Sequence, residues 1–148
     1  MGNVLLIGFG NPGRLDDGLG PALADAIEKL NVDGVDVDSN YQLTVEDASE
    51  VSNHDVVIFA DASVNCGEPF TFTQIQPKVD ISFTTHSIDP ESVLGLAYQL
   101  FSAKTKGYVL AIRGYEFNEF GEKLSGQAQN NLLDAITFIE KALRKKEF

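Results

Sequence analysis

The sequence has few of the residues and segments on which several classes of protein depend. Its only cysteine is Cys66, so no intrachain disulfide can form and a reducing compartment, the cytoplasm, is expected. No stretch approaches the roughly 20 apolar residues that a membrane-spanning helix needs. The chain starts in an apolar strand without a basic leader, so neither membrane attachment nor a signal peptide is expected.

Basic residues are also scarce. The chain has 11 lysines and arginines against 22 acidic residues, a net charge of −11. Such a surface repels phosphate backbones, which argues against nucleic acid as a partner. The basic run at 141–146 lies at the end of a predicted helix, where cations stabilise the helix dipole, so it is not interpreted as a binding patch.

Short apolar runs alternate with segments of helical periodicity. The apolar runs predict strands at 4–7, near 35–37, at 55–60 and at 107–112, with an edge or antiparallel strand at 69–75. Helices are predicted over 19–30, from Asp89-Pro90 onward, and after Ser125. Their predicted buried faces are Leu19, Leu23, Ile27 and Leu30; then Val93, Leu94, Ala97, Leu100 and Phe101; then Leu132, Leu133, Ile136, Ile139 and Leu143.

This alternation predicts the α/β class. We expect residues 1–148 to form one domain, a three-layer α/β/α sandwich around a mostly parallel twisted sheet of about five strands. Ligands of such sheets bind beyond the carboxyl ends of the strands. That rule selects Asp16 and Asp17 after the first strand, Asp61 at the end of the third, and His86 ahead of a helix.

Two carboxylates and an imidazole from separate loops fit a three-ligand metal site. Oxygen and nitrogen donors suit nickel or zinc, with positions left open for water or substrate. Each residue also has a structural interpretation. Asp17 could equally be a helix cap or a ligand, and Asp61 could equally be a turn former or a ligand. Asp16 is favoured as a cap of the following helix. His86 fits a hydrogen-bonded loop histidine, and His54 is expected to be a solvated loop residue.

Two other kinds of site are disfavoured. The glycine-rich loop at 8–13 follows a strand, but Pro12 removes a backbone donor and the acidic pair behind it repels a pyrophosphate. Cys66 has no helix N-terminus to lower its pKa, so a structural thiol is preferred to a nucleophile.

Three blocks of the sequence resemble one family in the same order. Gly8-Phe-Gly-Asn11 followed by Asp16-Asp17-Gly18-Leu-Gly20 resembles the opening signature of the hydrogenase maturation endopeptidases. The second block, 59–62, contains Asp61, and the third, 84–87, contains His86, with Leu94 following.

The resemblance implies a function and a site. These endopeptidases remove a C-terminal extension from the large-subunit precursor of nickel–iron hydrogenases after nickel insertion. Their metal ligands, also the catalytic residues, fall on Asp17, Asp61 and His86. The resemblance implies nickel supplied by the precursor, with another divalent cation as a substitute in vitro, and a monomeric enzyme. Asp16 is the nearest candidate for a general base.

Two alternatives remain beside this hypothesis. The first is a chaperone-like protein that binds the precursor at the same ligands without cutting it. The second is a peptidyl-tRNA hydrolase, which residues 8–13 also resemble, although its catalytic histidine has no counterpart and the acidic surface opposes tRNA. Residues 38–43 depart from the Asp-Gly-Gly-like turn of many endopeptidases, so a different substrate fit is expected. The aromatic loop at 114–121 is either a docking surface or a covered edge of the core.

Overall fold

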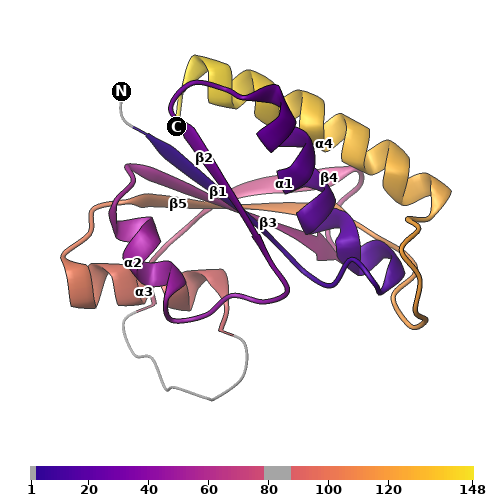
Figure 1. Ribbon diagram of the computed structural model, residues 1–148, viewed down its shortest axis with the longest axis horizontal. Coiled ribbons are helices and arrows are strands. Elements are labelled where there is room, and N and C mark those ends of the chain that lie inside the picture. Colours follow the sequence, from indigo (N-terminus) through magenta and orange to yellow (C-terminus); the bar gives the residue numbers. More distant parts are fainter. Residues whose placement is uncertain (1–2, 79–87) are drawn as a thin grey trace.

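The predicted α/β architecture is confirmed. A computed structural model describes residues 3–78 and 88–148, with helices on both faces of one sheet (Figure 1). The strands are β1 Val4–Phe9, β2 Val35–Asn40, β3 Val56–Ser63, β4 Phe70–Ile75 and β5 Lys106–Arg113. The helices are the 3-10 turn η1 Leu15–Gly18 and the α-helices α1 Leu19–Leu30, α2 Asp47–Ser52, α3 Pro90–Phe101 and α4 Gly126–Lys145.

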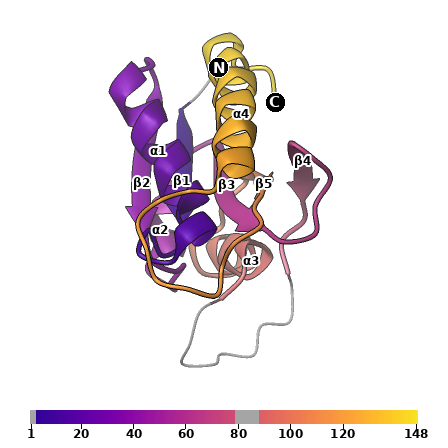
Figure 2. The same ribbon diagram turned by 90° about the vertical axis from the view of Figure 1, so that its right-hand side faces the viewer.

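The sheet has the strand order β2-β1-β3-β5-β4, which can be followed across Figure 2. The four strands β2, β1, β3 and β5 are parallel, and β4 joins the edge antiparallel to β5. The chain leaves β1 for β2 on one side and later enters β3 on the other side of β1. Such a reversal opens a crevice at the carboxyl ends of the two strands, here beyond Phe9 of β1 and Ser63 of β3.

Each face of the sheet carries its own core. Helices α1 and α4 cover one face and α2 and α3 the other (Figures 1 and 2). The residues of β1 alternate between the two: Leu6 packs with the α1 and α4 side, and Ile7 with the α2 and α3 side. This double burial explains why β1 and β3 are continuous apolar runs in the sequence.

Close contact between α1 and the sheet requires glycine. A Cβ on Gly20 would lie within 2.5 Å of the carbonyl oxygens of Phe9 and Ala60, so no side chain fits there. The start of α1 is thereby brought against the carboxyl ends of β1 and β3. The residues just before α1, including Asp17, therefore lie at the crevice.

Most predicted elements are confirmed, with corrections at their faces. Asp89 and Ser125 cap α3 and α4 through their side chains, as predicted. Leu30 is 36% exposed, Leu100 66%, Phe101 47% and Leu133 62%, so these four do not belong to buried faces. Helix α2 was not predicted because its six residues contain only Ala48 and Val51 as apolar side chains. Among the described residues, no helix has the length and apolar character needed to span a membrane.

Candidate active site

A pocket of about 530 Å³ lies at the carboxyl ends of β1 and β3. Phe9 and Gly10 form its wall at the end of β1, and Asp17 and Asp61 place two carboxylates in it. The remaining walls are the segments 41–43 and 88–90. The structure therefore brings together two of the three predicted ligands, at the edge of the sheet where the topology predicts a ligand site.

Asp17 is held by the loop that follows β1. The backbone N–H of Asn11 donates to Asp17 Oδ2 at 2.8 Å, and the Asn11 side chain accepts from Gly13 N at 2.8 Å, which stabilises the turn. Gly10 has φ +139°, and a Cβ there would collide with the carbonyl oxygen of Asp17. The Gly-Asn motif thus fixes the position of a carboxylate and does not form a phosphate cradle.

Asp61 lies within β3, on the same face of the sheet as the buried Phe59. Its Oδ1 accepts from the backbone N–H of Ala62 at 2.8 Å. No hydrogen bond from the described residues reaches the second oxygen of Asp61 or of Asp17. Each carboxylate therefore offers a free oxygen to a ligand in the pocket.

Burial raises the pKa of Asp61 to about 7; the hydrogen bond from Ala62 opposes the increase and the charge of Asp17 adds to it. Two carboxylates in one partly buried pocket therefore lack a compensating cation among the described residues. The ordinary pKa of an aspartate is 3.8, so the folded protein binds a proton here more tightly than the unfolded chain does.

Asp61→Asn is expected to stabilise the metal-free protein at pH 8. A raised acid pKa gives stability that is fully present below pH 3.8 and is lost as the pH rises through about 7. Asparagine removes that loss, so the variant should gain about 2–4 kcal/mol over the wild type at pH 8. Urea unfolding with a chelator at pH 5 and pH 8 measures this. Equal differences at both pH values would contradict the assignment.

Asp16 is neither a helix cap nor a general base, which corrects both expectations. It lies inside η1, is fully buried, and accepts hydrogen bonds from Tyr115 N, Glu116 N, Ser125 N and Ser125 Oγ at 2.7–3.0 Å. Burial alone raises the pKa of Asp16, but these hydrogen bonds outweigh it and the net pKa is lowered. Asp16 therefore fastens η1, and with it Asp17, to the start of α4.

His86 lies outside the described residues, as do Thr84 and Ser87. Its role as the third ligand stays a prediction. The described chain resumes at Ile88, which lines the pocket together with Asp89 and Pro90. Asp89 is engaged elsewhere, since it caps α3 through Ser92 N at 2.8 Å and pairs with Lys78 at 2.6 Å.

Residues 41–43, part of the segment that departs from the family pattern, flank the pocket. Tyr41 is 72% exposed at its mouth, whereas Leu43 is buried. The aromatic loop is divided: Phe117 packs beside Gly114, whereas Phe120 is 85% exposed under the guanidinium of Arg14.

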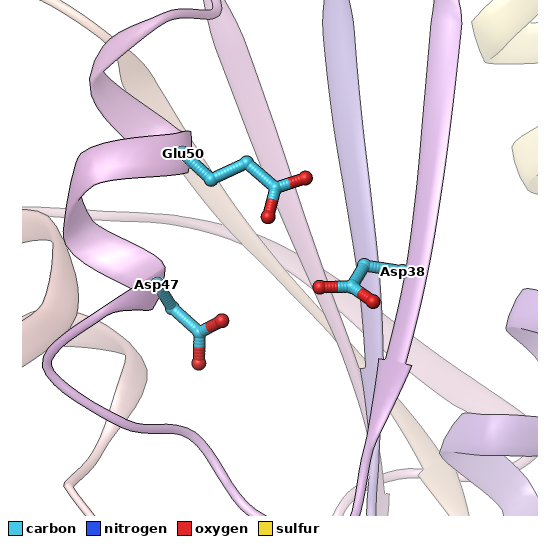
Figure 3. A group of neighbouring side chains, drawn as sticks. All are labelled: Asp38, Asp47 and Glu50. Atoms are coloured by element: carbon cyan, nitrogen blue, oxygen red, sulfur yellow. The ribbon is translucent and has the colours of Figure 1, made fainter.

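His54 is buried, which corrects its expected solvation. Its Nδ1 contacts Glu50 O at 2.8 Å and its Nε2 contacts Asp36 Oδ2 at 2.7 Å. Beside it lies a second group of carboxylates that the sequence analysis did not identify. Asp38 on β2 and Asp47 and Glu50 on α2 point toward one another, with oxygens within 4.8 Å of each other (Figure 3).

Solved structures with a similar fold include hydrogenase maturation proteases. The protease HycI of Thermococcus kodakarensis has a TM-score of 0.75 at 17% identity, over 97% of this chain and 92% of that one. The endopeptidase HybD of E. coli has a TM-score of 0.71 at 21% identity, over 97% and 93%. The chain has the fold of the hydrogenase maturation proteases.

The likeness extends over almost the whole chain. The hydrogenase 2 maturation peptidase of a Thaumarchaeota archaeon has a TM-score of 0.69 at 21% identity, over 95% of this chain and 97% of that one. No protein-family model and no protein of curated function matches the sequence. The resemblance predicted from three sequence blocks is thus confirmed as a shared three-dimensional fold.

Proposed function

We propose that this chain is an endopeptidase that removes the C-terminal extension of a nickel–iron hydrogenase large-subunit precursor after nickel insertion. The observation that carries the proposal is the meeting of Asp17 and Asp61 in one pocket. The pocket lies in a fold shared with structures named as hydrogenase maturation proteases.

The donors present fit a divalent cation. Asp17 and Asp61 are hard oxygen donors, each with an oxygen free of hydrogen bonds from the described residues, and the pKa of Asp61 is raised to about 7. A cation between them would relieve the repulsion that contributes to that increase. We assign the metal to these two residues and to His86, and we take it to be the nickel that the precursor carries.

The chemistry follows from what each group does. A divalent ion held there would polarise the scissile carbonyl or lower the pKa of a water molecule. Asn11 fixes Asp17 through its N–H, and Asp16 anchors the same turn to α4, so the carboxylate needs no rearrangement when the precursor binds. The raised pKa, about 7, favours the protonated form of Asp61 in the metal-free protein, and a cation held there would favour the ionised form.

The proposal includes a setting for the enzyme. With one cysteine and a net charge of −11, we expect it to act in the cytoplasm as a monomer that binds the precursor and not nucleic acid. A precursor-binding protein that does not cut would use the same carboxylates. Cleavage therefore has to be measured directly.

Incubation with a nickel-loaded precursor is expected to remove a C-terminal peptide, detected as a loss of mass in the precursor. Nickel-free precursor should remain uncut, since the pocket by itself provides ligands but no cation. Complex formation without any change in mass would replace the protease by a binding protein. Equal cleavage with and without nickel, in the presence of a chelator, would overturn the metal assignment.

A further inference from the structure

The outer side of β2 is an edge of the sheet. Among the described residues β2 has one neighbouring strand, β1. Asn40 O accepts from Gly10 N at 3.1 Å on the β1 side, and backbone groups alternate along a strand. The backbone groups of Val35, Val37 and Ser39 therefore face outward. Val35 N donates to Val32 O at 3.2 Å and Ser39 N to Asp38 Oδ1 at 2.9 Å, so among the described residues the N–H of Val37 is the outward donor of β2 that has no partner. An edge of this kind is a template for another strand.

A groove follows this edge into the candidate active site. Four hollows succeed one another along it, lined in turn by Val35–Val37, Val37–Ser39, Ser39–Tyr41 and Tyr41–Leu43 of the chain. Neighbouring hollows also share residues from outside β2: Glu28, then Pro21, then Gly10. The last hollow contains Asp17 and Asp61. An extended chain lying along β2 would therefore lead to the pocket that contains the two carboxylates.

The two sides of the groove differ in chemistry. Val35 and Val37 belong to the core on the α1 side. Asp36 and Asp38 alternate with them: Asp38 faces α2 (Figure 3), and Asp36 contacts His54 just after α2 at 2.7 Å. Asp25, Glu28 and Glu50 also line the groove, and no described lysine or arginine does. A strand added here would place alternate side chains against apolar and acidic surfaces.

We propose that the free edge of β2 binds an extended segment in which apolar residues alternate with lysine or arginine. Its backbone pairs with β2 and its basic side chains meet the carboxylates of Asp38 and Glu50. That the segment is part of the hydrogenase precursor rests on the proposed function, whereas the binding does not. A second copy of this chain is disfavoured as occupant because two acidic β2 edges would repel each other.

The probe is a labelled peptide, acetyl-Val-Lys-Val-Lys-Val-Lys-amide, titrated against the metal-free full chain by fluorescence anisotropy. A glutamate counterpart tests charge. Two further versions are N-methylated, one at every valine and one at every lysine. Because backbone groups alternate, strand pairing predicts that one methylated version binds at least about tenfold more weakly while the other changes by less than about threefold.

Charge-reversed variants locate the peptide on the protein. Asp38→Lys and Glu50→Lys should each weaken the lysine peptide by about tenfold, whereas Asp134→Lys, an exposed position on α4 with the same change in net charge, should stay within about twofold. Thermal unfolding shows whether each variant is folded. If one of the two groove variants does not fold, the other is sufficient for the test.

Three results would overturn the proposal. The first is equal binding of the glutamate and lysine peptides, and the second is equal binding of both methylated versions with the unmodified one. The third is displacement of the peptide by calcium chloride at an ionic strength where sodium chloride has no effect, which would make the carboxylates a cation site. If the peptide tests fail but the precursor is cleaved, the proposed β2 site is wrong and the proposed function stands. If the peptide binds as expected but the precursor is not cleaved, the β2 site stands and the proposed function is wrong.

Discussion

Asp61→Ala is expected to lower the rate of precursor processing by more than about a hundredfold. Mutation of a residue that only hydrogen-bonds to a metal ligand typically lowers metal affinity or activity by about 10- to 100-fold. Asp61 is proposed as a ligand itself, so a larger loss is expected. Of the three aspartates that line the pocket among the described residues, Asp89 already caps α3 and pairs with Lys78, so Asp17 alone would remain as a ligand. Asp17→Ala and His86→Ala should give losses of the same order.

The measurement is the rate of mass loss from a nickel-loaded precursor under single-turnover conditions. Asp55→Ala is the matched control. Asp55 is an exposed aspartate directly before β3, at the opposite end of that strand from Asp61. It should process the precursor at the wild-type rate. Undiminished cleavage by both Asp61→Ala and His86→Ala would end the metal-site hypothesis, whatever the fold.

Asp16→Ala is expected to destabilise the protein by about 3–5 kcal/mol at pH 7, since it leaves buried donors without an acceptor. Asp16 is fully buried and accepts four hydrogen bonds from residues about a hundred positions away in sequence. Asn should recover part of the loss, because it keeps one acceptor oxygen but turns an amide N–H₂ toward donors.

Urea unfolding measures this loss, with Asp25→Ala as control. Asp25 forms an exposed ion pair with Lys29 on α1, so its removal should cost less than about 1 kcal/mol. The lowered pKa of Asp16 also sets a direction with pH: its contribution is present above pH 3.8 and is lost as the pH falls through the folded pKa. The alanine variant should lose that part of the acid sensitivity. If Asp16→Ala has the same free energy of unfolding as the wild type, Asp16 does not anchor η1 to α4.

Long segments with strong periodicity were predictable from the sequence alone. Strands β1 and β3 are read directly from their apolar runs, and α3 and α4 begin where Asp89 and Ser125 predicted. A short helix and the exact buried face of a long one were not predictable. Helix α2 is too short for a period to emerge, and Leu133 matches the stripe of α4 although it is 62% exposed. Periodicity gives the face of a helix but not where the opposing layer ends.

The sequence by itself determined which residues follow the strands. It therefore identified Asp17 and Asp61 as candidates, because parallel strands carry their carboxyl ends to one edge. The family resemblance placed the metal ligand on Asp17, and only the tertiary structure showed the separate role of Asp16. The two are adjacent in the chain, yet one carboxylate faces the pocket and the other is buried against Ser125. The donors to Asp16 come from segments about a hundred residues away, whereas the donor to Asp17 is the nearby N–H of Asn11. Burial, which sets the role of each carboxylate, is a property of packing that no local pattern contains.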